Sequence, residues 1–310
     1  MILSVSRRTD IPAFYTDWFF NRLKQGFVYV RNPMNYRQVS EVELNPGVID
    51  CIVFWTKDPT NILTKLELLS DYHFYFQITV NVYDQRIERN VPDKNRVVPA
   101  FRALSETIGR ERTIWRYDPI ILTDGMDMES HCRNFELLSA KLEGYTGQCI
   151  ISFVDLYRKT LRNMSGITYL PIDNDMMKTM GERLVQIGQR HGIALKACSE
   201  QTDLSSVGIQ HASCIDGELI SRITGKPVDA KKDKNQRAIC GCIESIDIGA
   251  YNTCRHGCLY CYANYSDSTV KNNLLKHDPG SPMLIGNLEP EDTVKKRKMV
   301  SLVSNQIEMI

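Results

Sequence analysis

Three cysteines near the end of the chain have the spacing needed to hold an iron–sulfur cluster. Cys254, Cys258 and Cys261 follow a C-x3-C-x2-C pattern, with Tyr260 directly before the last of them. Three thiolates this close can hold three corners of a four-iron cluster and leave one iron open to a small ligand, whereas electron-transfer clusters are typically closed by four cysteines. A structural zinc loop is the alternative. The spacing and the aromatic neighbour favour a [4Fe–4S] cluster with one open iron.

Four more cysteines lie upstream and are enough to close a second, fully coordinated site. They are Cys198, Cys214, Cys240 and Cys242. Gly241 separates the last two, and a residue without a Cβ lets the backbone fold tightly enough for both sulfurs to face one metal. We expect a second, auxiliary iron–sulfur cluster here. A tetrahedral zinc site is the structural alternative, and simple burial of some of these thiols is a third.

The composition is that of an ordinary globular protein. Of 310 residues, 43% are hydrophobic and 24% charged. Lys plus Arg number 38 against 37 for Asp plus Glu, so no overall basic field favours nucleic acid as a partner. The first residues lack the apolar core of a signal peptide, and no apolar run approaches the ~20 residues of a membrane span. We therefore expect a cytoplasmic protein with reduced or metal-bound cysteines, of which Cys51, Cys132 and Cys149 fit buried, inert thiols.

The elements that must position these cysteines alternate between strands and helices. Strands are predicted at 2–6, 51–57, 74–83, 113–121, 149–156 and 193–198, and helices near 14–25, 60–70, 96–108, 128–143 and 174–190. This alternation predicts an α/β fold whose parallel strands form a full or partial (β/α) barrel. An open doubly wound sheet is the rival, but no glycine-rich phosphate loop follows the first strand. We expect barrel units over 1–200, a cysteine-rich segment completing the barrel over 201–265, and a C-terminal extension over 266–310.

Polar residues stand at the end of each predicted strand. In parallel α/β folds ligands bind at the carboxyl ends of the strands, so these side chains should converge on one mouth. Any one of them alone is explained by a solvated loop or a salt bridge, but six strand ends together favour a substrate chamber. The candidate catalytic residues are Lys57, Arg116 and Asp118, and the candidate cofactor-binding residues are Thr79, Asn81, Ser152 and Tyr260. Lys57 and Arg116 are suited to an anionic group of a cofactor or substrate.

The cysteine trio with Tyr260 resembles the signature of radical S-adenosylmethionine (SAM) enzymes. In that superfamily the open iron chelates the amino acid part of SAM, and Tyr260 stands where the family places an aromatic beside the adenine. The resemblance implies reductive cleavage of SAM at the cluster, which yields a 5′-deoxyadenosyl radical that acts on a substrate. It also implies a reductant such as flavodoxin or ferredoxin.

Further stretches widen the resemblance. Residues 51–57, 76–81 and 116–121 are similar to strands of radical SAM enzymes related to spore photoproduct lyase, and Glu88, Pro92 and Arg96 to the Glu…Pro…Arg stretch of that group. The whole chain also resembles the bacterial domain of unknown function 1848 family. That likeness is carried by residues 6–12 and 54–59 and by the stretch from Cys240 to Asn264.

The order of these motifs departs from the usual radical SAM pattern. The cysteine motif normally follows the first strand, whereas here it follows the strand-like run 245–249 near the end of the chain. A circular permutation explains this order, since the first and last strands of a barrel are neighbours. We therefore predict that 245–249 lies beside 2–6 and brings the trio to the same mouth as Arg8, Lys57, Asn81 and Arg116.

The sequence thus favours a radical SAM enzyme of unknown substrate, either a small molecule or a nucleotide-like compound. Two other classes stay open: an iron–sulfur electron carrier or redox sensor, and a zinc-stabilised protein that binds nucleic acid. The third would use the basic stretches 231–237 and 295–298, but in a chain of balanced charge such runs are typical of a solvated surface.

Overall fold

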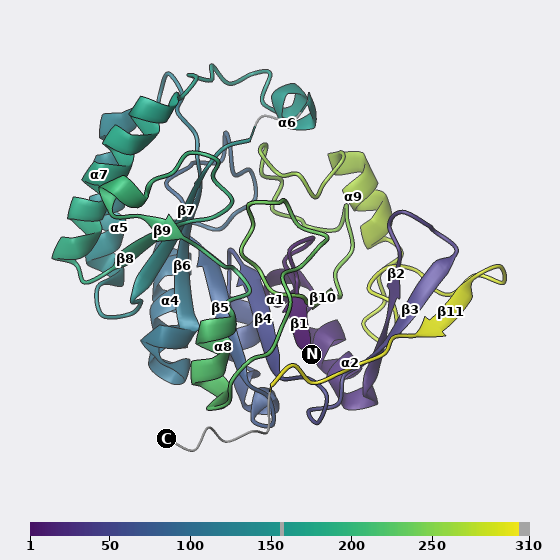
Figure 1. The fold of residues 1–310 in the computed structure, drawn as a ribbon. Coiled ribbons are helices and arrows are strands. Elements are labelled where there is room, and N and C mark those ends of the chain that lie inside the picture. Colours follow the sequence, from purple (N-terminus) through teal and green to yellow (C-terminus); the bar gives the residue numbers. More distant parts are fainter. Residues whose placement is uncertain (156–157, 304–310) are drawn as a thin grey trace.

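The computed structural model describes residues 1–155 and 158–303 and is built around one parallel sheet (Figure 1). Its eight strands are ordered β10-β1-β4-β5-β6-β7-β8-β9, and all neighbours run parallel. Their bounds are β1 Ile2–Val5, β4 Cys51–Thr56, β5 Phe74–Thr79, β6 Thr113–Ile120, β7 Gln148–Phe153, β8 Ala194–Ala197, β9 Gln210–His211 and β10 Ile246–Asp247. The predicted α/β class with a parallel sheet is confirmed. Within the described ranges, β9 and β10 are the edges of this sheet.

The predicted neighbourhood of the first and last strands is also confirmed. β10 pairs with β1 through Leu3 and Ile246 and through Ser4 and Asp247. A two-residue strand has few ladder bonds, and the Asp247 carboxylate adds to them by accepting hydrogen bonds from the hydroxyls of Ser4 at 2.6 Å and Ser6 at 2.7 Å. Hydrogen bonds to a charged group are stronger than neutral ones. Asp247 therefore fixes this short strand against the start of the chain.

Helices connect the strands much as the sequence predicts. They are α1 Ile11–Phe14, α2 Thr16–Gln25, α3 Thr60–Leu63, α4 Lys94–Ile108, α5 Met128–Leu142, α6 Arg158–Asn163, α7 Asn174–Arg190, α8 Gly217–Thr224 and α9 Asp267–Leu274, with short 3-10 turns η1 Leu66–Leu69, η2 Arg110–Arg112 and η3 Ser205–Val207. Asp93, Asp127 and Asp173 cap α4, α5 and α7 by accepting a backbone N–H of the first turn. No helix in the described ranges has the length and apolar character to cross a membrane.

The two faces of the sheet are covered differently. On one face Phe54 and Phe76 pack with side chains of α2, α4, α5 and α7 in the main apolar cluster. On the other face Val53 and Tyr75 pack against Leu219 of α8, which crosses in front of the strands in Figure 1. Apolar side chains of α8 cover the part of this second face that contains Val53 and Tyr75. Polar groups gather only toward the carboxyl ends.

A small second sheet was not predicted. β2 Phe27–Arg31 and β3 Gln38–Glu43 form an antiparallel hairpin, and β11 Thr293–Lys296 adds to β3 in parallel. It lies to the right of the main sheet in Figure 1. The basic stretch 295–298 thus begins in an exposed strand.

Candidate functional site

The cysteine loop sits at the carboxyl end of the sheet, held by the segment that follows β5. Glu88 forms an antiparallel bridge with Cys258. The Leu259 N–H donates to the Ile87 carbonyl at 3.0 Å, and the Asn90 N–H donates to the His256 carbonyl at 2.9 Å. Backbone pairing of this kind fixes a loop that has no regular structure of its own. Residues 87–90 therefore act as a clamp on the cysteine loop.

Tyr260 joins the cysteine loop to the ends of β4 and β5. Lys57 Nζ donates to the Tyr260 hydroxyl at 2.9 Å and to Glu88 Oε1 at 2.8 Å. Asn81 Nδ2 donates to the same hydroxyl at 3.2 Å, and the hydroxyl donates to Glu88. The prediction that the trio shares one mouth with Lys57 and Asn81 is confirmed.

Glu88 is the buried carboxylate at the centre of this network. Its side chain is 1% exposed, and Lys94 lies 3.5 Å away on the side opposite the Lys57 contact. Burial alone would raise the pKa of Glu88, but the positive charges of Lys57 and Lys94 lower the pKa to about 2. Glu88 is thus ionised at neutral pH and orients both Lys57 and Tyr260.

Asp10 ties the same loop to the end of β1. Its carboxylate accepts from the Lys57 backbone N–H at 2.7 Å and from His256 Nε2 at 2.8 Å, and it caps α1 through the Ala13 N–H. Three segments far apart in the chain therefore meet on one carboxylate. Both Asp10 and His256 are buried, which makes these contacts structural supports of the site.

The three cysteines of the loop are free thiols that crowd one another. Burial raises the pKa of Cys254 well above its usual value, and the neighbouring Cys261 and Cys258 raise it further. Burial likewise raises the pKa of Cys258 to about 12, although Lys57 opposes this. Two buried atoms of the same loop, His256 Nδ1 and Asn264 Oδ1, have no hydrogen-bond partner within the described residues. Clustered thiols beside unpaired polar atoms fit a loop that receives a bound group.

The second set of cysteines also comes together. Cys198, at the end of β8, has its Sγ 3.2 Å from the Sγ of Cys214. Cys214 contacts Cys242 through its sulfur, and Cys242 contacts Cys240. A hydrogen bond from Cys242 lowers the pKa of Cys240 to about 6. The gathering of these four thiols is confirmed, and their metal ligation stays a prediction.

Arg116 and Asp118 connect the two cysteine groups. Arg116 Nη1 donates to Cys214 Sγ at 2.9 Å and to Gln77 Oε1 at 2.6 Å, and its Nε donates to Asp118 Oδ2 at 3.0 Å. The Asp118 N–H in turn donates to Asn81 Oδ1 at 2.9 Å. Asn81 also contacts Tyr260, so one chain of hydrogen bonds runs between the two groups. Arg116 is buried with each guanidinium nitrogen bonded to the protein, an arrangement that supports its neighbours before any ligand arrives.

The remaining predicted residues lie at the same rim. Ser152 donates its hydroxyl to Asp118, and Thr79 is half-buried on β5 in register with Arg116. Arg8 is half-buried beside β10, with its Nε 3.7 Å from an Asp247 carboxylate oxygen. Their roles toward a cofactor stay predictions.

Sequence reasoning missed the supporting residues Glu88, Asp10, His256 and Asp247 as members of the site. Two signals were present. Glu88 belongs to a stretch that resembles the spore photoproduct lyase group, and Asp10 ends the polar run after the first strand. His256 and Asp247 had none, because their partners lie more than 240 residues away in the chain.

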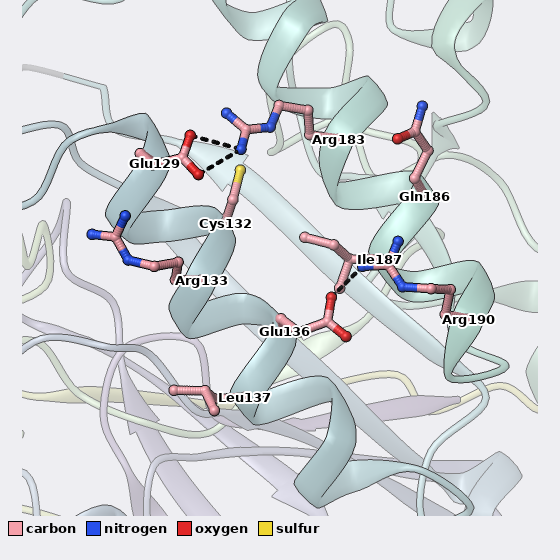
Figure 2. A pocket seen from close by; sticks show the side chains of 9 residues that line it. All are labelled: Glu129, Cys132, Arg133, Glu136, Leu137, Arg183, Gln186, Ile187 and Arg190. Carbon is pink, nitrogen blue, oxygen red and sulfur yellow. Dashed lines mark hydrogen bonds and ion pairs between the residues drawn. The ribbon is translucent and has the colours of Figure 1, made fainter.

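A groove of about 490 Å3 lies elsewhere, between α5 and α7 on the outer helical layer. Figure 2 shows two of its three arginines turned toward glutamates, Arg183 to Glu129 and Arg190 to Glu136. None of the candidate site residues lines it. Cys132 does, with a side chain that is 4% exposed, in keeping with the inert thiol predicted there.

No group of three or more His, Cys, Asp or Glu side chains in the described ranges is disposed to hold a metal ion as it stands. A cluster with one open iron needs three thiolates on one loop, and Cys254, Cys258 and Cys261 provide this donor set. The chemistry of the donors therefore fits the group that the sequence predicts.

Gly257 gives a test of how tightly the clamp holds the cysteine loop. Its φ is +64°, and a Cβ there would lie 3.0 Å from Asn90 Nδ2, which donates to the Arg255 carbonyl. Gly257→Ala is expected to lower the free energy of unfolding by about 1–2 kcal/mol and to reduce bound iron per chain. Urea denaturation and iron analysis measure both.

Gly286→Ala is the matched control, since Gly286 has φ +69° and open space around its Cβ position. Gly286→Ala should lower the free energy of unfolding through backbone strain alone and leave the iron content per chain unchanged. Equal iron in wild type and in Gly257→Ala would contradict the clamp.

The fold and the site define an α/β protein that gathers two cysteine groups at the carboxyl ends of its parallel strands. Residues 2–263 match the family described as a domain of unknown function (DUF1848), and the chain belongs to this family. No curated protein matches the chain. The matched region runs from β1 to just beyond Cys261, so it includes both cysteine groups and leaves out β11.

Proposed function

We propose that this protein is a radical SAM enzyme with Cys254, Cys258 and Cys261 as the ligands of a [4Fe–4S] cluster. The observation that carries the proposal is the contact of Tyr260 with Lys57 and Asn81. It puts the cysteine loop at the ends of the strands, where parallel α/β proteins bind their ligands. A three-cysteine loop at the amino ends of the strands would be far from these polar side chains.

In this proposal, different residues bind the cofactor and the substrate. Cys254, Cys258 and Cys261 would hold the cluster, which when bound would supply the chemistry of reductive SAM cleavage. Tyr260 is the candidate for the adenine contact by its resemblance to the signature. Lys57 offers a cation for the SAM carboxylate or for an anionic substrate, and Glu88 holds it in place. Asn81, Thr79 and Ser152 offer polar groups along the same rim, to bind cofactor or substrate and orient it.

The finer fold assignment belongs to the same proposal. A partial, circularly permuted (β/α) barrel is supported by the order of the strands, in which β1, β4, β5, β6, β7 and β8 follow the chain and β10 precedes them. In a permuted barrel, the strand that leads into the cysteine motif would be the last one made and would pair with the first. The parallel pairing of β10 with β1 has this arrangement.

Anaerobic reconstitution followed by a SAM cleavage assay tests the proposal. We expect about four irons and four sulfides per chain at the trio, an electron paramagnetic resonance signal that SAM perturbs, and 5′-deoxyadenosine once a reductant such as flavodoxin or ferredoxin is supplied. Iron–sulfur content without any response to SAM would favour an electron carrier or redox sensor. Zinc alone, after oxygen-free preparation, would overturn the cluster and favour a zinc-stabilised protein.

A further inference from the structure

We infer that Cys198, Cys214, Cys240 and Cys242 hold a single tetrahedral metal ion, with zinc as its chemical class, in place of the auxiliary iron–sulfur cluster that the sequence favours. This goes beyond the proposed function, because a structural ion here does not depend on SAM. The four thiols share one apolar cluster beneath the polar rim. Cys214, Cys240 and Cys242 are buried and Cys198 is half-buried.

The separation of the sulfur atoms distinguishes the two kinds of site. Zinc–sulfur bonds of about 2.3 Å in a tetrahedron place neighbouring sulfurs about 3.8 Å apart. A four-iron cluster binds each cysteine at a different iron, so its four sulfurs lie much farther apart. Cys198 Sγ and Cys214 Sγ are 3.2 Å apart, and the contacts continue from Cys214 to Cys242 and Cys240. The Cys198 and Cys214 sulfurs would need to separate by roughly half an ångström to bind one zinc ion together.

Donors around the sulfurs match what thiolate ligands need. The Arg116 guanidinium donates to Cys214 Sγ at 2.9 Å, and the Ile215 N–H donates to Cys242 Sγ at 3.4 Å. Outer hydrogen bonds of this kind orient metal ligands. Four thiolates around a divalent ion carry a net charge of about −2, and a buried guanidinium beside them offsets part of it.

Hydrogen bonds to backbone carbonyls join the segment that carries Cys214 to the segment that carries Cys240 and Cys242. The Ile243 N–H donates to the Ile215 carbonyl at 3.2 Å, and the Ser213 hydroxyl donates to the Gly241 carbonyl at 3.0 Å. A Cβ on Gly241 would lie only 2.6 Å from Ser213 Oγ. The Cys-Gly-Cys turn is therefore built for close approach to the segment that carries Cys214.

An ion at this place would join the end of β8 to the segments on either side of α8, and it would hold Arg116 through Cys214. Arg116 in turn supports Asp118 and Asn81, the last of which contacts Tyr260. The ion would thus position the rim that faces the cysteine loop.

The test uses the full chain with Cys254, Cys258 and Cys261 all changed to alanine, purified without oxygen from cells grown with zinc and iron. Elemental analysis should find about one zinc per chain, and zinc X-ray absorption should show a shell of sulfur alone at about 2.3 Å. Adding Cys240→Ala to this variant should abolish the zinc, whereas adding Cys132→Ala, at a buried cysteine outside both groups, should leave it.

About four irons per chain in the trio-less variant would overturn the single-ion site in favour of a cluster. Four alkylatable thiols without metal, or a Cys198–Cys214 disulfide after anaerobic work-up, would overturn any metal site here. Because the metal count is made on a chain that lacks the trio, it is independent of SAM cleavage. If the variant with Cys240→Ala does not fold, the zinc and iron content of the variant that lacks only the trio still distinguishes a single ion from a cluster.

Discussion

Replacing Cys254, Cys258 and Cys261 with alanine is expected to reduce 5′-deoxyadenosine formation to the level of a no-enzyme control. The trio supplies every cysteine of the loop that residues 87–90 clamp to the mouth of the sheet. Without thiolates no iron can be retained there, and the SAM-sensitive paramagnetic signal should disappear with it. Measuring product, iron and spectrum on one preparation checks the expectation.

The single variants Cys258→Ala and Cys132→Ala make the matched comparison. Cys132 is a buried thiol on α5, outside both cysteine groups, so its loss should leave SAM cleavage intact. Cys258→Ala should abolish it. Persistent 5′-deoxyadenosine in the triple variant would mean that the reaction does not use this loop.

Lys57→Ala is the second change with a large expected effect. It removes the cation nearest to Glu88 and leaves a carboxylate that is 1% exposed with only Lys94, at 3.5 Å, for a charged partner. Breaking a buried ion pair from one side typically destabilises by 3–5 kcal/mol, and Lys94 puts this case near the lower end, at about 3 kcal/mol. SAM cleavage should fall as well, because Tyr260 loses one of its hydrogen-bond donors, while iron at the trio should stay.

Urea denaturation, iron analysis and the cleavage assay together separate these effects. Lys65→Ala serves as the control, since its pair with Asp17 is solvent-exposed and such pairs contribute little. A Lys57→Ala protein that cleaves SAM at the wild-type rate would exclude Lys57 from the site. Loss of iron in the same variant would show a role in holding the loop instead.

Much of the main sheet follows from local pattern. Strands such as β4 and β5 are apolar segments ended by polar residues, and the helix after β5 carries an aspartate cap, so local physical chemistry specifies them. The second sheet was missed for a physical reason. The hairpin of β2 and β3 is half-exposed on several positions and short, and its third strand, β11, comes from a distant part of the chain.

Some residues of the candidate site could also be predicted from local pattern, and others could not. Lys57 and Asn81 could be named from their positions just after β4 and β5, and Arg116 from its place within β6, because the carboxyl ends of parallel strands share one rim. The partners of Arg116 could not be foreseen, since Cys214 and Gln77 reach it only through the packed tertiary structure. Whether clustered cysteines suit one ion or several depends on distances between sulfurs, which no spacing in the sequence specifies.

The pairing of β10 with β1 also bears on the order in which the protein is made. Ser4 and Asp247, which share a hydrogen bond, are 243 residues apart. At about 5–20 residues per second, a ribosome needs roughly 12 to 50 seconds to pass from one to the other. Throughout that time the β1 edge has open backbone groups on which another chain could pair. Cys254, Cys258 and Cys261 emerge still later, so any metal that these three cysteines bind can be delivered only after the strands from β1 to β9 have been made.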